Sequence, residues 1–194
     1  MAQRWTRRET SSRFGKFRGE VVATWLIDAD GPDRTMRLEA DFSYTSPAGI
    51  QWPAPKGRMI DGASIPSVFW GPLIGSPYTG DFRRASVVHD VACEDRPYTS
   101  DDAHRMLYDA MRCDGTVEWL AKEIYTAVKM FGPQWGLKQR PLPLTHDNLL
   151  LYYDLVHSAA IRANLRTLDA AISRARKLSM SKTLRKRTVR RAYG

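Results

Sequence analysis

The order of hydrophobic and polar positions separates a strand-rich first part of the chain from a helix-rich second part. Residues 20–27 (EVVATWLI) and 35–44 (TMRLEADFSY) are rich in β-branched and aromatic side chains, which is typical of strands. The segment DADGPD between them supplies Asp, Gly and Pro for a turn. With a third strand near residues 50–52 and irregular chain at 52–57, the pattern predicts an N-terminal antiparallel β-meander.

Helical periodicity dominates from about residue 67 onward. The spacing predicts a short apolar helix or turn at 67–73 and longer helices at about 81–95, 100–112 and 117–130. The first of the longer helices is expected to end at Arg96, because the residue before a proline avoids the α region. The second is expected to begin at Thr99 or Ser100, where a hydroxyl cap precedes two acidic residues.

Apolar positions recur at helical spacing from about residue 145 to about residue 177, after the proline-rich segment KQRPLPLTHD. A helix of about 30 residues is about 45 Å long, so its end would project from a small domain or pack on another subunit. The alternative is a kinked helix that folds back on its own domain. The predicted fold class is α+β: an antiparallel β-meander, a helical half and a long C-terminal helix.

The distribution of charged residues along the chain suggests how it divides into domains. The first 19 residues hold six Arg or Lys and one acidic residue, whereas residues 20–170 hold 15 basic and 20 acidic residues. Residues 171–194 hold nine basic residues and none that is acidic. We therefore expect a basic arm at 1–19, a core domain at 20–140, the long helix at 141–177 and a basic tail at 178–194.

The basic ends are candidate binding surfaces for nucleic acid or for another anionic partner. The tail residues concerned are Lys182, Arg185, Lys186, Arg187, Arg190 and Arg191. No aromatic residues are interleaved with them in the manner of a sequence reader, so a sequence-specific complex is not expected. A solvated tail without a partner is the alternative, and the long helix is the candidate surface for self-association or for other structural proteins.

The remaining composition narrows the class of protein. The chain has 194 residues, of which 43% are hydrophobic, and this is a globular composition. Cys93 and Cys113 lack metal-type spacing, so we expect reduced structural thiols, with a single disulfide as the alternative. No apolar run is long enough to span a bilayer, and the N-terminus lacks the apolar core of a secretory signal. A location in a virion or in the host cytoplasm is expected.

The stretch RRASVVHDVACEDR (83–96) carries the first candidate catalytic group. His89 lies beside the apolar face that Ala85 and Val88 share, while Asp90 is rotated by about 100° from it. The two side chains therefore diverge, and each would have to serve a different partner. In the catalytic interpretation His89 is a general base, and Asp90 reaches a divalent metal or orients a loop.

Two further residues extend the candidate site. His104 is expected on the inner side of the next helix, and two antiparallel helices joined through residues 96–99 would place His104 opposite His89. Asp61 begins the tight turn of the IDGASIP segment and could contribute a third polar group. The alternative is that His89, Asp90 and Asp61 form a buried polar network that fixes the loop against the helices, without catalysis.

Four motifs resemble, in order, those of a phage and prophage family catalogued as domain of unknown function 1353. They are DGASIPSVFW, GDFRRASVVHDVA, AHRMLYDAM and YTAVKMFGPQW, and the similarity covers about residues 35–137. The positions that match are Asp61, Ala63, Ser64, Ile65, Pro66, His89, Asp90, Tyr125, Val128, Gly132 and Trp135. Two positions depart from the family pattern: Ile60 replaces a usual threonine, and His104 replaces a usual aspartate.

The resemblance implies a phage or prophage origin, near tail and lysis genes, and no established activity. The layout is also similar, more loosely, to that of secreted phospholipases, in which a helical His-Asp pair supplies a general base and a calcium ligand. We expect a virion- or tail-associated protein with a structural or assembly role. The alternative is a lipid- or cell-wall-directed hydrolase with His89 as its general base, and nucleic-acid binding through the tail is a third hypothesis.

Overall fold

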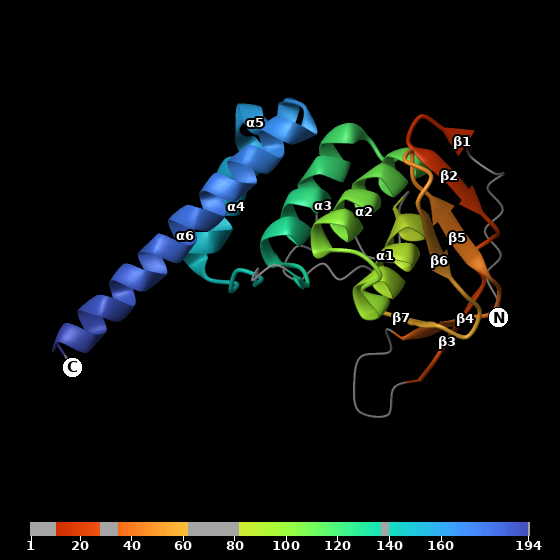
Figure 1. The fold of residues 1–194 in the computed structure, drawn as a ribbon, viewed down its shortest axis with the longest axis horizontal. Coiled ribbons are helices and arrows are strands. Elements are labelled where there is room, and N and C mark those ends of the chain that lie inside the picture. The colour runs from red at the N-terminus through yellow and green to blue at the C-terminus, as the bar shows by residue number, and fades with distance from the viewer. Residues whose placement is uncertain (1–10, 28–34, 62–81, 137–139, 194) are drawn as a thin grey trace.

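The computed structural model describes residues 11–27, 35–61, 82–136 and 140–193, and of these the side chains of residues 13 to 181. Figure 1 shows the β-sheets at one end, the central helices beside them and the C-terminal helices at the other end. This order of strands followed by helices confirms the predicted α+β class. The predicted turn at 28–34, the helix or turn at 67–73 and the loop residues Ala63 to Pro66 lie outside the described residues.

The described strands form two antiparallel sheets. The larger sheet has the order β1-β2-β5-β6 and the smaller one the order β3-β4-β7. The strands are β1 (Ser11–Ser12), β2 (Gly15–Arg18), β3 (Ala23–Trp25), β4 (Met36–Leu38), β5 (Phe42–Thr45), β6 (Gln51–Ala54) and β7 (Met59–Ile60). The topology differs from a meander because β2 pairs with β5, and the β3–β4 hairpin between them belongs to the other sheet.

Three strand predictions need correction. The segment 35–44 is two strands rather than one, because the chain leaves the smaller sheet after Leu38 and joins the larger sheet at Phe42. Part of the expected basic arm, residues 11–18, forms β1 and β2. The expected irregular chain at 52–57 begins as strand β6, which tolerates Pro53 because β5 is its single partner among the described strands.

Three central helices follow the strands: α1 (Arg83–Asp95), α2 (Ser100–Asp114) and α3 (Glu118–Phe131). Helices α1 and α2 contact the strands and carry His89, Asp90 and His104, whereas α3 packs on α2. Helix α1 ends where Arg96 adopts a left-handed conformation before Pro97, and Thr99 and Asp102 form a reciprocal capping box at the start of α2. The helix starts and stops thus agree with the predicted ones to within two residues.

One hydrophobic core extends from the larger sheet through these helices to the C-terminal helices. Its largest members on the sheet side are Phe17, Phe42, Tyr44 and Trp52, and all are almost completely buried. Phe17 stacks on Phe42 and is tilted against Tyr44. Helix α1 contacts β5, β6 and β7, whereas α2 contacts β2, so both helices are fixed on the sheet through apolar packing.

The C-terminal part is three helices instead of the single predicted helix. They are α4 (His146–His157), α5 (Ala159–Arg162) and α6 (Leu165–Tyr193). The Ser158 side chain accepts a hydrogen bond from the Ala160 backbone, and Asn164 accepts one from the Thr167 backbone. These caps end one helix and begin the next, which explains both breaks. Helix α6 also includes the predicted basic tail, so 177 is not a structural boundary.

Helix α6 is anchored on α3 along its first half. Leu168, Ala171, Ile172 and Ala175 form its buried stripe. The Arg176 guanidinium donates hydrogen bonds to the carbonyl oxygens of Lys129 and Met130, at the end of α3, and of Arg140. About one turn later, Ser179 donates a hydrogen bond to Asn148 of α4, and beyond Ser179 the helix continues away from the other elements (Figure 1). No described helix is long and apolar enough to cross a membrane.

Candidate functional site

His89 of α1 and His104 of α2 are in direct contact. The distance from His89 Nε2 to His104 Nδ1 is 3.0 Å. The two helices are antiparallel neighbours joined by residues 96–99 (Figure 1), so the predicted meeting of the two histidines on facing surfaces is confirmed. The structure therefore brings together two of the four candidate residues.

The surrounding groups determine which nitrogen atoms carry protons. The Pro133 carbonyl oxygen lies 3.0 Å from His104 Nε2 and can only accept, so His104 Nε2 is the donor. His104 Nδ1 is then the acceptor, and His89 Nε2 donates to it. The Gln134 amide nitrogen lies 3.1 Å from His104 Nε2 and donates to the Val128 and Lys129 carbonyl oxygens. For neutral rings, this pattern assigns the Nε2–H tautomer to both imidazoles, in a one-way chain that ends at a backbone carbonyl.

Cys93 lies one helical turn after His89 and contacts the same ring. Its Sγ atom is 3.8 Å from His89 Nδ1 and 3.7 Å from His89 Nε2. Because the sulfur is nearly equidistant from both nitrogen atoms, it packs against the imidazole instead of pointing at one of them. Cys93 and Cys113 are both buried and form no disulfide, as the sequence predicted.

The histidine pair is enclosed in the core. Both His89 and His104 have exposed fractions of 0%. Burial, reinforced by the neighbouring His104, lowers the pKa of His89 well below its ordinary value of 6.5. Burial and the charge of Lys129 lower the pKa of His104 to about 3, against the opposing hydrogen bond to Pro133. With these lowered pKa values neither ring gains a proton at neutral pH, so the two rings can pack together in the core without burying a charge.

The two candidate aspartates occupy different environments from the histidines. Asp90 is 5% exposed, and Asp61 is exposed at the end of β7. The contacts of His89 are with His104 and Cys93, so neither aspartate orients its ring in the described structure. Among the described residues, no group of three or more His, Cys, Asp or Glu side chains could hold a metal ion.

The segment after α3 completes the surroundings of His104 and was only partly foreseen. Trp135 donates a hydrogen bond from its indole nitrogen to the Tyr98 carbonyl, and its backbone carbonyl accepts one from Ser100. This segment therefore clasps the α1–α2 connection and places Pro133 and Gln134 against His104. The matching of Gly132 and Trp135 to a motif indicated that the segment matters, but no spacing rule links Pro133 to a histidine 29 residues earlier.

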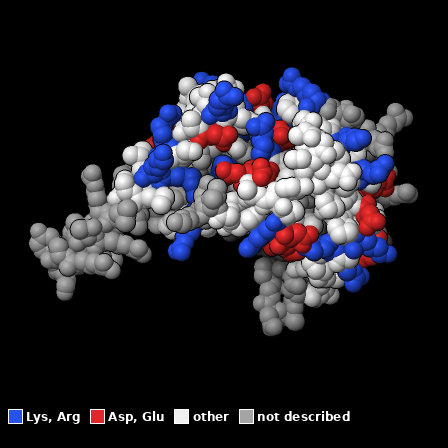
Figure 2. Space-filling model, viewed as in Figure 1, with Lys and Arg blue, Asp and Glu red and all other residues white. Residues whose placement is uncertain are grey.

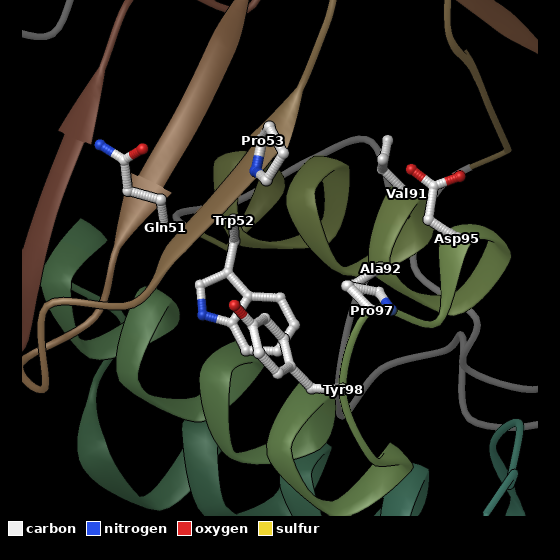
Figure 3. Close-up of a pocket in the computed structure, with 8 residues that line it drawn as sticks. All are labelled: Gln51, Trp52, Pro53, Val91, Ala92, Asp95, Pro97 and Tyr98. Atoms are coloured by element: carbon white, nitrogen blue, oxygen red, sulfur yellow. The ribbon is translucent and has the colours of Figure 1, made fainter.

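A cavity of about 350 Å³ opens on the sheet side of α1 (Figure 3). Gln51, Trp52 and Pro53 of β6 form one wall, and Val91, Ala92 and Asp95 of α1 with Pro97 and Tyr98 form the other. Trp52 and Tyr98 meet edge to face at a centroid distance of 4.9 Å. Neither His89 nor His104 lines this cavity, so it gives a substrate no access to them.

The predicted tail surface follows α6. Residues 182–193 are helical, while the side chains of Lys182, Arg185, Lys186, Arg187, Arg190 and Arg191 lie outside the described ones. Figure 2 shows Lys and Arg side chains on the visible face of the C-terminal helices, next to this extension. The basic character of the tail therefore continues onto the body of the protein.

Comparisons with known proteins match the central part of the chain. Residues 36–128 match a family model described as "Protein of unknown function (DUF1353)". An uncharacterised protein of Sinorhizobium fredii, y4jT, is 46% identical over 127 residues, which cover 66% of this chain and 37% of that protein. A second one, y4iH, is 39% identical over 111 residues, which cover 57% of this chain and 46% of that protein. The chain thus spans less than half of either relative, and no solved structure gives a significant match.

Proposed function

We propose that this chain is a structural or assembly protein of a phage or prophage particle, in or near the tail, and that it acts by docking. The observation that carries the proposal is that the candidate catalytic histidines are buried in the core, whereas a long basic helix extends from the body of the protein. The chemically capable histidines are fully buried, whereas α6 extends beyond the packed body with a strongly basic sequence. The phage setting is supported by the order of the four sequence motifs.

The anchoring of α6 supports a docking role. The charged Arg176 bonds to three backbone carbonyls, and Tyr125 donates a 2.7 Å hydrogen bond to Asp169 on the same helix. Hydrogen bonds that involve a charged group are about twice as strong as neutral ones. The first half of α6 is therefore fixed in direction, and a partner that binds its second half meets a rigid support.

A hydrolase remains the second candidate function, and one specific observation favours it. The imidazoles of His89 and His104 are hydrogen-bonded to each other, and histidine is the side chain that most often serves as a general base. Under this alternative a conformational change has to bring a substrate to His89. Hydrolysis that is lost in a folded His89→Gln variant would favour the alternative over docking.

The docking role is tested on particles of the phage or prophage that encodes the chain. We expect quantitative mass spectrometry of density-purified particles to find the chain in a fixed number of copies per particle. A variant that ends at residue 180 retains the buried stripe of α6, and we expect it to be depleted from particles at least about tenfold. Absence of the full chain from purified particles would contradict the proposal.

A further inference from the structure

We infer that the outer face of α5 and α6 binds the phosphate backbone of duplex nucleic acid. This inference rests on the proposed docking function and names the partner of the docking helix. The described part of this surface consists of four basic side chains, which we call the α6 basic face. They are Arg162 of α5 and Arg166, Arg174 and Lys177 of α6.

The α6 basic face is open and uncompensated. All four side chains are exposed, and none of them forms a salt bridge in the described structure. Arg166, Arg174 and Lys177 lie on one side of α6 at about 100° per residue, opposite the stripe that packs on α3. The fold itself thus makes no use of these charges, in contrast to Arg176, which is committed to carbonyl groups.

In the first half of α6 the exposed basic residues lie on one side of the helix, whereas in the second half they occur at positions all around it. The positions that would continue the buried stripe are taken by basic residues such as Lys186 and Arg190. Arg187 and Arg191 fall on other sides of the helix. In the sequence, basic residues recur four positions apart at 182–186, 186–190 and 187–191, and like charges at this spacing destabilise a helix by about 0.2–0.5 kcal/mol per pair unless a partner supplies counter-charges.

The major groove of duplex DNA provides counter-charge on two sides. It is about 12 Å wide, admits an α-helix and has a row of phosphates along each edge. Helix α6 has 29 residues and is about 43 Å long, so its free half reaches well into such a groove. A lipid surface offers charge on one side, and a helix that inserts into it needs an apolar face, which residues 181–193 lack because Leu184 and Val189 are their sole aliphatic residues larger than alanine.

Fluorescence anisotropy with a labelled 25-base-pair DNA duplex tests the inference on the full chain. We expect binding to two unrelated sequences with similar affinity and with a steep loss as salt increases. The triple variant Arg166→Ala, Arg174→Ala, Lys177→Ala should bind at least about tenfold more weakly at 100 mM salt. The slope of log affinity against log salt should fall by about 2–3, close to one for each lost phosphate contact.

A matched control removes the same charge elsewhere. Lys16, Arg18 and Lys56 are exposed on the sheet side of the molecule, and replacing all three with alanine should leave the affinity within about threefold. Equal losses in the two triple variants would overturn the inference, because net charge alone would then explain binding. Binding to vesicles with 30% phosphatidylserine but not to the duplex would also overturn it. Particle incorporation is measured separately, so failure of the docking role and failure of duplex binding are distinguishable.

Discussion

Replacing His89 with alanine should lower the free energy of unfolding by about 3 kcal/mol. The substitution leaves a cavity at a fully buried position between α1 and α2 and deprives His104 Nδ1 of its donor. Both effects act in the same direction, because a buried acceptor without a partner adds its own desolvation cost. Urea denaturation at pH 7, followed by circular dichroism, measures the change.

Two companion variants make this result interpretable. His146→Ala removes an exposed histidine at the start of α4 and should change the free energy of unfolding by less than about 0.5 kcal/mol. His89→Gln keeps an N–H that can donate to His104 and should recover part of the lost stability. If His89→Ala has the same midpoint urea concentration of unfolding as the wild type, the histidine pair does not stabilise the fold.

Acidification should destabilise the protein through the same pair. The folded-state pKa values of both histidines lie below the unfolded value of 6.5, so the unfolded chain binds more protons as the pH falls. The contribution to stability is complete above pH 6.5 and is lost progressively below it, down to about pH 3 for His104. Between pH 6.5 and pH 5 each histidine should cost about 2 kcal/mol of unfolding free energy.

The variant His104→Gln isolates this effect from other titrating groups. Burial raises the pKa values of Asp109 and Glu123, and these carboxyls oppose the trend because the folded protein binds their protons more tightly. They are present in both proteins, so they cancel in the comparison. We expect His104→Gln to lose about 2 kcal/mol less than the wild type between pH 6.5 and pH 5. Equal losses in the two proteins would show that His104 titrates normally in the fold.

Local signals in the sequence were sufficient to predict where the central helices begin and end. The capping box at Thr99 and the proline after Arg96 act within one helical turn, and the structure follows both. The sheets were harder to predict because strand pairing is a long-range property. Nothing near Phe42 indicates that β5 pairs with β2 instead of with β4, since this choice depends on which faces the helices cover.

The C-terminal helices show the limit of periodicity. The apolar stripe persists across Ser158 and Asn164, although both residues cap new helices. Serine and asparagine bond to backbone N–H groups nearby, and such local bonds compete with a continuous helix without disturbing the apolar spacing. The prediction of one helix from residue 145 to residue 177 was wrong for this reason.

The contact between the two histidines could be predicted from the sequence, but the groups that complete the site could not. Helical geometry placed His89 and His104 on facing surfaces, because the connection between α1 and α2 is short and forces an antiparallel return. The acceptor for His104 could not be foreseen, because Pro133 reaches it only after α3 has crossed the molecule. The extent of the basic surface was also missed, because the exposure of Arg166, Arg174 and Lys177 depends on which side of α6 packs against α3.

His89 and His104 form a closed pair in the core, which leaves the exposed basic helix as the surface through which we propose that the protein acts. Long-range proton–nitrogen NMR of the imidazole rings, recorded from pH 8 to pH 5 on the full chain, tests whether both rings stay neutral. We expect two of the four histidines to remain neutral Nε2–H tautomers throughout, and to disappear in turn in His89→Gln and His104→Gln. An imidazole of either residue that becomes protonated between pH 8 and pH 5 would contradict this expectation.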